Sequence, residues 1–180
     1  MSYRRLFLFV EGDDDERFFR SVIAPLLHNA YDNIQFVKVG WLKKEKVRAF
    51  LRSIEAMKAD YILAHDLDWL PCASAARDRI LKIHPQVNPD RIQIVKAEIE
   101  SWYCAGIPAD HPWSSLPIGR CPETSVVTKE AFEAAVSREG PSRLFAMLSL
   151  LESFDREAAA QRNESFRRFL RKFVASPATR

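Results

Sequence analysis

The sequence has little of what marks several large classes of protein. Its 180 residues include only five glycines and three cysteines, and the cysteines (Cys72, Cys104 and Cys121) show no CxxC or comparable zinc-ligand spacing. The remaining composition is that of an ordinary globular chain, which excludes a collagen-like, coiled-coil or disordered protein. We expect the three thiols to be reduced, as in a cytoplasm.

Long apolar runs and nucleotide-binding loops are also missing. No apolar run approaches the ~18–20 residues that a bilayer-spanning helix needs, and only a short apolar segment precedes Glu11. We therefore expect no membrane span and no secretion signal, and a cytoplasmic location. The pattern GxxxxGK[ST] does not occur, which excludes nucleotide binding through a P-loop. The net charge of +3 is too small to indicate nucleic-acid binding by itself.

What the chain does contain is a regular alternation of two apolar patterns. Four short apolar runs are typical of strands buried on both faces. They are Leu6–Val10, Ile34–Val39, Tyr61–Ala64 and Ile92–Val95. Between these runs the apolar residues recur with a period of 3.6, which predicts helices. The alternation predicts an α/β fold, Rossmann-like, with a mainly parallel four-stranded sheet, flanking helices, and ligands at the carboxyl ends of the strands.

The pattern changes after Gly106, where prolines and short polar links form a long loop. We place a domain boundary here, with an α/β domain at residues 1–122 and a helical extension at 123–180 packed on it. Helices are expected at 129–136, with Thr128 as N-cap, at 142–154 and at 156–174, with a break at Gly140-Pro141. Their apolar stripes have to be buried. These stripes are Phe132, Ala135 and Val136; Leu144, Leu148 and Leu151; and Phe166, Phe169, Leu170 and Phe173.

Acidic residues follow three of the predicted strands. The clusters are Glu11 to Glu16, Asp66-Leu67-Asp68 and Glu98-Ile99-Glu100. The carboxyl ends of parallel strands meet at one edge, where gathered carboxylates favour Mg²⁺ or Mn²⁺ as a neutralising ion. If residues 66–68 are extended, Asp66 and Asp68 project to the same side. Only one of Glu98 and Glu100 can easily face such a site, and the acids at 13–16 alternatively serve as the acidic first turn of a helix.

The motifs Val10-Glu11-Gly12, Asp66-x-Asp68 and Glu100-Ser101-Trp102 together resemble the Toprim domain, in the variant of OLD-family nucleases and of small stand-alone Toprim-like bacterial proteins. In that variant a second acid follows the first motif after four positions, and here it is Asp15. The resemblance covers about residues 4–106. The segment Glu164–Phe169 is also similar to the tail of the stand-alone proteins.

The resemblance implies Mg²⁺- or Mn²⁺-dependent hydrolysis of phosphodiester bonds in DNA or RNA, with two ions, and a role in phage defence beside a separate ATPase protein. Glu11 would act as general acid/base or metal ligand, while Asp66 and Asp68 would hold metal. Asp15 and Glu100 would support a second ion. Lys96, near the end of the fourth strand, would neutralise charge in the transition state.

Two further features leave alternatives open. Basic residues near the second predicted helix and in the last one would track a phosphate backbone, or are simply solvated helix faces. These are Lys43, Lys44, Arg167, Arg168 and Arg171. The segment 61–71 also looks like the phosphoacceptor strand of a response-regulator receiver, although no fifth strand ending in lysine follows. A third interpretation is a binding module without activity. His65 adjoins the acids and is either a base or ligand or, as we favour, a packed histidine at a strand end. Trp102 is interpreted as a core residue.

Overall fold

The structure is a computed structural model, and it describes residues 3–40, 42–139 and 142–175. By packing, the chain divides into two compact units, Met1–Ile94 and Val95–Arg180. We call them the N-terminal unit and the C-terminal unit. The expected break at Gly140-Pro141 lies outside the described residues.

Within the described residues, four parallel strands form one sheet in the order β2-β1-β3-β4. The strands are β1 (Arg5–Val10), β2 (Asn33–Lys38), β3 (Asp60–Asp66) and β4 (Ile92–Val95). Leu8 of β1 pairs with Phe36 of β2 on one side and with Ile62 of β3 on the other. Residues 6–10 are all buried, because a central strand of a parallel sheet is covered on both faces. The predicted parallel α/β sheet is confirmed.

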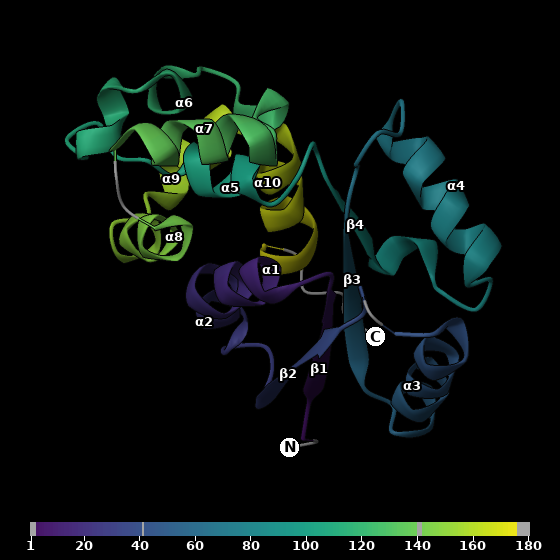
Figure 1. The fold of residues 1–180 in the computed structure, drawn as a ribbon. Helices are drawn as coiled ribbons and strands as arrows, with labels where there is room; N and C mark the ends of the chain where they lie inside the picture. The colour runs from purple at the N-terminus through teal and green to yellow at the C-terminus, as the bar shows by residue number, and fades with distance from the viewer. Residues whose placement is uncertain (1–2, 41, 140–141, 176–180) are drawn as a thin grey trace. The chain divides into compact units, whose positions relative to one another are not determined.

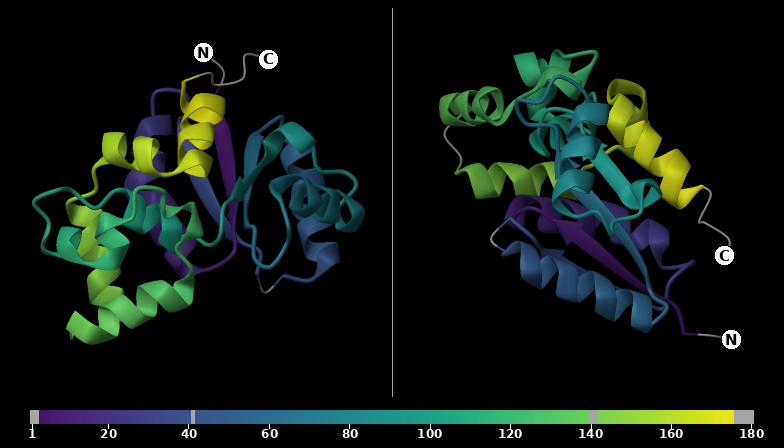
Figure 2. Two further views of the ribbon diagram at one scale, coloured as in Figure 1. Left: turned by 90° about the horizontal axis from the view of Figure 1, so that it is seen from above. Right: turned by 90° about the vertical axis from the view of Figure 1, so that its right-hand side faces the viewer.

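Helices flank both faces of the sheet in the N-terminal unit. One helical segment comprises α1 (Asp13–Phe18), the π-helical η1 (Phe19–Ile23) and α2 (Ala24–Leu27); the others are α3 (Lys44–Ala56), α4 (Ala73–Ile83) and the short η2 (Pro89–Arg91). Figures 1 and 2 show α1 and α2 on one face and α3 and α4 on the other. On the second face, strand residues such as Phe9 and Leu63 pack against Leu51 of α3 and Ile80 of α4.

The C-terminal unit is helical, as predicted for the end of the chain. Its elements are α5 (Glu100–Ala105), η3 (Pro112–Ser115), α6 (Pro117–Arg120), η4 (Thr124–Val126), α7 (Lys129–Glu139), α8 (Arg143–Glu152), α9 (Arg156–Arg162), α10 (Glu164–Phe169) and η5 (Leu170–Val174). Trp102 of α5 is fully buried, with its ring 5.2 Å from that of Phe166 and 5.6 Å from that of Phe169. Because α5 packs with the last helices, the division falls at residue 94, earlier than the loop-based boundary at 122.

Two expectations about the C-terminal helices are wrong. The helix expected at 156–174 is broken at Asn163, which is extended (φ −138°, ψ 113°) and caps α10 by accepting a hydrogen bond from the backbone N–H of Phe166. On α8, Leu144 and Leu148 are 50% and 42% exposed, whereas Met147 is fully buried. The periodicity identified the helix but selected the wrong face, because apolar residues occupy more than one side of it. No helix in the described ranges is long and apolar enough to cross a membrane.

Candidate functional site

The carboxyl ends of β1 and β3 border a pocket of about 410 Å³ within the N-terminal unit, which we call the Glu11 pocket. Its ionisable lining residues are Glu11, Lys44, His65, Asp68, Arg79 and His84. Side chains alternate between the two faces of a strand, so residues two positions apart share a face. Phe9 and Leu63 lie on the face covered by α3 and α4, and Glu11 and His65, each two positions later, therefore belong to that face as well. The strand pattern itself therefore directs one acid and one histidine into the same space.

Glu11 is held by two contacts from β3. Its Oε1 accepts a hydrogen bond from the backbone N–H of Asp66 at 2.8 Å and lies 2.8 Å from Nδ1 of His65. The same Nδ1 is 2.7 Å from the carbonyl oxygen of Asp66. Since both neighbours are acceptors, the proton of the histidine ring is on Nδ1. The two strands thus fix the carboxylate and the imidazole against one another.

These contacts oppose the effect of burial on both groups. Burial raises the pKa of Glu11, but the hydrogen bond and charge of His65 and the N–H of Asp66 outweigh it and leave that pKa below its ordinary value. For His65, burial lowers the pKa, and the hydrogen bond and charge of Glu11 raise it further than burial lowers it. Glu11 is therefore a carboxylate at neutral pH.

Gly40, just after β2, is required for this arrangement. Its backbone N–H donates to the carbonyl oxygen of Glu11 at 3.1 Å. A Cβ atom at this position would lie 2.6 Å from the same oxygen, closer than real Cβ contacts. Only glycine lets the chain after β2 approach Glu11 this closely.

Asp68 reaches the pocket through a turn, which corrects the expectation of an extended segment at 66–68. Strand β3 ends at Asp66, and Asp68 is in the left-handed region with φ 51°, a conformation that aspartate tolerates better than most residues. Burial raises the pKa of Asp68, and the negative charge of Glu11 raises it further, against smaller opposing effects of His65 and Arg79. By strand alternation Asp66 belongs to the opposite face from His65, and it is buried there.

Asp15 and its acidic neighbours occupy the first turn of α1. Asp15 is buried, and its Oδ2 accepts from the backbone N–H of Gly12 at 3.2 Å. Asp13 lies 2.6 Å from Nζ of Lys38, and Glu16 pairs with Arg20. Negative charge is favourable at a helix start, so these contacts fit the alternative of an acidic first turn. A second-ion role for Asp15 stays a prediction.

The remaining predicted acids and Lys96 lie in the C-terminal unit and have contacts of their own there. Glu100 is 3% exposed and forms an ion pair with Arg143. Burial raises the pKa of Glu100, and Arg143 only partly offsets this. Glu98 accepts from the backbone N–H of Lys129 at the start of α7, at 2.6 Å. Nζ of Lys96 is 2.8 Å from a carboxylate oxygen of Glu164.

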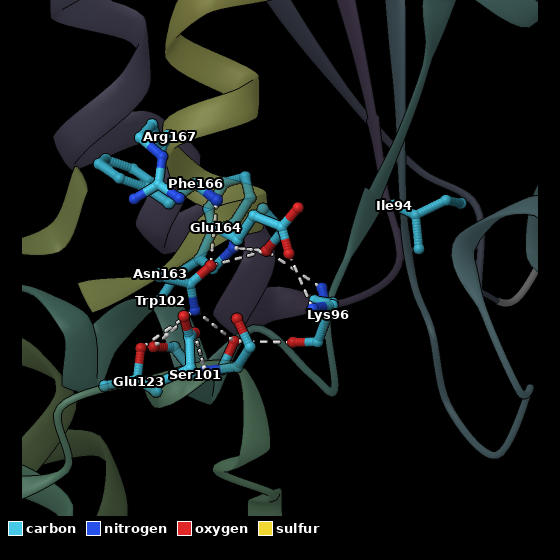
Figure 3. A network of polar contacts seen from close by, with 12 residues as sticks. Ile94, Lys96, Ser101, Trp102, Glu123, Asn163, Glu164, Phe166 and Arg167 are labelled. Atoms are coloured by element: carbon cyan, nitrogen blue, oxygen red, sulfur yellow. Dashed lines mark hydrogen bonds and ion pairs between the residues drawn. The ribbon is translucent and has the colours of Figure 1, made fainter. Parts of the chain in front are cut away.

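Figure 3 shows a polar network within the C-terminal unit that includes Lys96, Trp102 and Asn163. Asn163 is fully buried at its centre, and its Nδ2 donates to Thr124 Oγ1 at 3.0 Å. Its Oδ1 accepts from the Ser165 hydroxyl at 2.8 Å. Oγ of Ser165 in turn accepts from the Trp102 indole N–H at 2.8 Å. The Glu-Ser-Trp motif around residue 102 is thus tied to the last helices, and Trp102 is the core residue that we predicted.

The basic residues expected to meet nucleic acid are all exposed. Lys44 lines the Glu11 pocket, and Lys43 is the extended residue that precedes α3. Arg167 and Arg168 of α10 and Arg171 of η5 are exposed, as expected. Arg167 also donates to the carbonyl oxygen of Ala160 at 2.9 Å. Their placement leaves both alternatives, a phosphate contact or a solvated helix face, open.

The oxygen atoms that the Glu11 pocket offers are of the kind that bind magnesium or manganese ions. Glu11 and Asp68 supply hard carboxylate oxygens, and the charge of Glu11 already raises the pKa of Asp68. No group of three or more His, Cys, Asp or Glu among the described residues is arranged to hold a metal. Mg²⁺ commonly keeps several waters and is held by one or two carboxylates together with substrate phosphates. Two carboxylates therefore suit a hard cation whose other coordination positions are filled by waters or phosphate oxygens, not a closed metal cage.

The sequence pattern undervalues one lining residue and misses another. For His65 it favours a packed histidine over a base or ligand, although His65 lies two residues after Leu63 on β3 and therefore on the same face, toward the pocket. Arg79 lies in the middle of a helix, not at a strand end, so the strand pattern does not point to it, and it lines the pocket because α4 packs there.

No protein-family model, curated protein or solved structure matches this chain.

Proposed function

We propose that the N-terminal unit is a Toprim-like nuclease domain that hydrolyses phosphodiester bonds of DNA or RNA with Mg²⁺ or Mn²⁺. The observation that carries the proposal is the convergence of Glu11 and Asp68, from the ends of adjacent strands, on a pocket that also has Lys44 and Arg79 in its lining. Carboxylates for a hard cation and cations for a phosphate are the two halves of a phosphodiester site.

The chain's own residues have separable tasks in this proposal. Glu11, ionised and held by the N–H of Asp66 and by His65, serves as metal ligand or as base toward the attacking water. Asp68 is the second ligand. A bound divalent ion would activate water and stabilise the charge that develops on the phosphate. Lys44 and Arg79 attract and orient the phosphate by their positive charge.

Three of the expected site residues are not part of the proposed first metal site. Asp15, Lys96 and Glu100 have contacts within their own units and are not assigned to the first metal ion. The three free cysteines fit a reducing compartment, so we place the reaction in the cytoplasm. A separate ATPase partner and a role in phage defence rest on the family resemblance alone.

The test is cleavage of labelled single- and double-stranded DNA and RNA by the full chain with Mn²⁺ or Mg²⁺. Glu11→Gln keeps an oxygen for the N–H of Asp66 but removes the charge, so the rate should fall at least ~10²-fold. Asp68→Asn should do the same. Asp78→Asn is the matched control, since Asp78 is an exposed acid next to Arg79 on α4.

The outcomes separate the proposal from a contaminant. Loss of cleavage in Glu11→Gln and Asp68→Asn, with normal rates in Asp78→Asn, supports it. If the wild-type chain cuts none of the substrates with either metal, or if Glu11→Gln cuts as fast as wild type, the proposal is wrong. Calorimetry with Mn²⁺ on Asp66→Ala and Asp68→Ala then shows which aspartate holds the ion.

A further inference from the structure

Trp69 is the most exposed of the large hydrophobic side chains in the part of the chain that the structure describes. It is 77% exposed, whereas Trp102 and Trp113 are 0% and 9% exposed. Burying a large apolar side chain is strongly favourable, and tryptophan is highly buried on average. The exposed Trp69 side chain therefore points to a role outside the core.

The turn after β3 holds this side chain outside the core. Leu67 and Leu70, on either side, pack against the hydrophobic cluster of the N-terminal unit, and Leu70 N–H donates to Leu67 carbonyl oxygen at 3.1 Å. The left-handed Asp68 lies between them. With both ends of the turn anchored, Asp68 lines the Glu11 pocket, and Trp69 follows it directly in sequence.

Arg79 links the tryptophan to the pocket. Its guanidinium carbon lies 5.1 Å from the centroid of the Trp69 ring, a cation–π contact from α4 to the turn. Arg79 is also one of the residues that line the Glu11 pocket. An exposed aromatic ring and a positive charge thus adjoin the proposed phosphodiester site.

We propose that Trp69 and Arg79 form a stacking platform for an unpaired base of single-stranded DNA or RNA, and this inference rests on the proposed function of the pocket. Bases stack on exposed aromatic rings whatever their sequence. The guanidinium of Arg79 lies over one face of the Trp69 ring, so a base stacks on the opposite face, and the positive charge adds attraction. In a duplex each base is already stacked on its neighbours, so an unpaired base is the ligand that offers its face. The adjoining phosphate then lies toward Arg79 and Lys44.

Binding to the full chain is measured in EDTA, where no cleavage can occur. The probes are a 5′-labelled dT12, an rU12, and an abasic 12-mer of tetrahydrofuran units that has the same phosphates without bases. We expect the wild-type chain to bind dT12 or rU12 about tenfold more tightly than the abasic strand. Trp69→Ala should abolish this preference, and Trp69→Phe, which keeps a ring, should retain part of it.

Tyr3→Ala is the matched control. Tyr3 is also an exposed aromatic residue of the N-terminal unit, 61% exposed, and Arg5 lies over its ring at 5.3 Å. Its loss should leave the preference unchanged, and thermal melting should show that Trp69→Ala folds like wild type. If wild type binds the abasic strand as tightly as dT12 and rU12, or if Trp69→Ala keeps the preference, the platform does not exist.

The two proposals fail in different ways. A base preference that requires Trp69, in a chain that cleaves nothing, would overturn the nuclease and keep the platform. Cleavage that requires Glu11 but proceeds equally in Trp69→Ala, with unchanged base preference, would keep the nuclease and overturn the platform. Comparison of dT12 with rU12 assigns the platform to DNA, to RNA or to both.

Discussion

Replacement of the buried Asn163 by alanine is expected to destabilise the C-terminal unit strongly. Three of its side-chain hydrogen bonds have ordinary lengths: to Thr124 Oγ1 at 3.0 Å, from the Ser165 hydroxyl at 2.8 Å and from the Phe166 N–H at 3.0 Å. At about 1 kcal/mol each, their loss amounts to about 3 kcal/mol. The last of them is the N-cap of α10, so its loss is already included in this sum.

Asn163→Asp separates the donor role from the acceptor role. The Ser101 hydroxyl donates to the Lys96 carbonyl oxygen at 2.9 Å, and the Thr124 hydroxyl donates to the Arg162 carbonyl oxygen at 3.2 Å. Because each hydroxyl has one hydrogen and already donates it, neither can donate to an aspartate at position 163. The carboxylate oxygen in place of Nδ2 would therefore be buried without a hydrogen-bond donor. Burial then raises its pKa in the folded state, and stability should recover as the pH falls toward that value.

The assay is urea unfolding followed by far-UV circular dichroism and by tryptophan fluorescence, which includes Trp102. Asn88→Ala is the control, because Asn88 is an exposed asparagine whose side chain accepts from the N–H of Asp90. It should cost at most about 1 kcal/mol. The reasoning is refuted if Asn163→Ala costs no more than Asn88→Ala, or if Asn163→Asp shows the same pH dependence as wild type.

Two further predictions follow from other contacts. Tyr31 donates to Asp60 at 3.1 Å, and burial, with the charge of Asp60, raises the pKa of its phenol above the usual 10.0. The neutral phenol therefore stabilises the folded chain below pH 10.0, and this stabilisation is lost as the pH rises further. The free energy of unfolding of the wild type should fall above that pH, while that of Tyr31→Phe should change less. Acetyl phosphate with Mg²⁺ should leave no stable adduct on Asp66 or Asp68, because a receiver needs a lysine from a fifth strand and the described sheet has four. A stoichiometric adduct in mass spectrometry would replace the nuclease with the receiver interpretation.

Local patterns were sufficient to predict most of the secondary structure. The apolar runs marked the four strands, and the 3.6-residue period between them marked helices such as α3 and α4. These elements are encoded locally, because a strand buried on both faces or a helix with one buried side imposes its own period on the sequence. The same alternation places Glu11 and His65 on one face of the sheet.

Contacts between distant residues decided the rest. Asn163 is a favoured N-cap residue, but its other side-chain hydrogen bonds reach Ser101 and Thr124, which are 62 and 39 residues away and which no local pattern reveals. The left-handed turn that brings Asp68 to the Glu11 pocket depends on Leu67 and Leu70 packing into the core. Arg79 reaches the pocket and Trp69 only because α4 packs on the face of the sheet that carries Glu11. The sequence by itself determined which elements form and which acids end the strands; tertiary packing decided which of these acids share a pocket, since burial and charge act between residues that only the fold brings together.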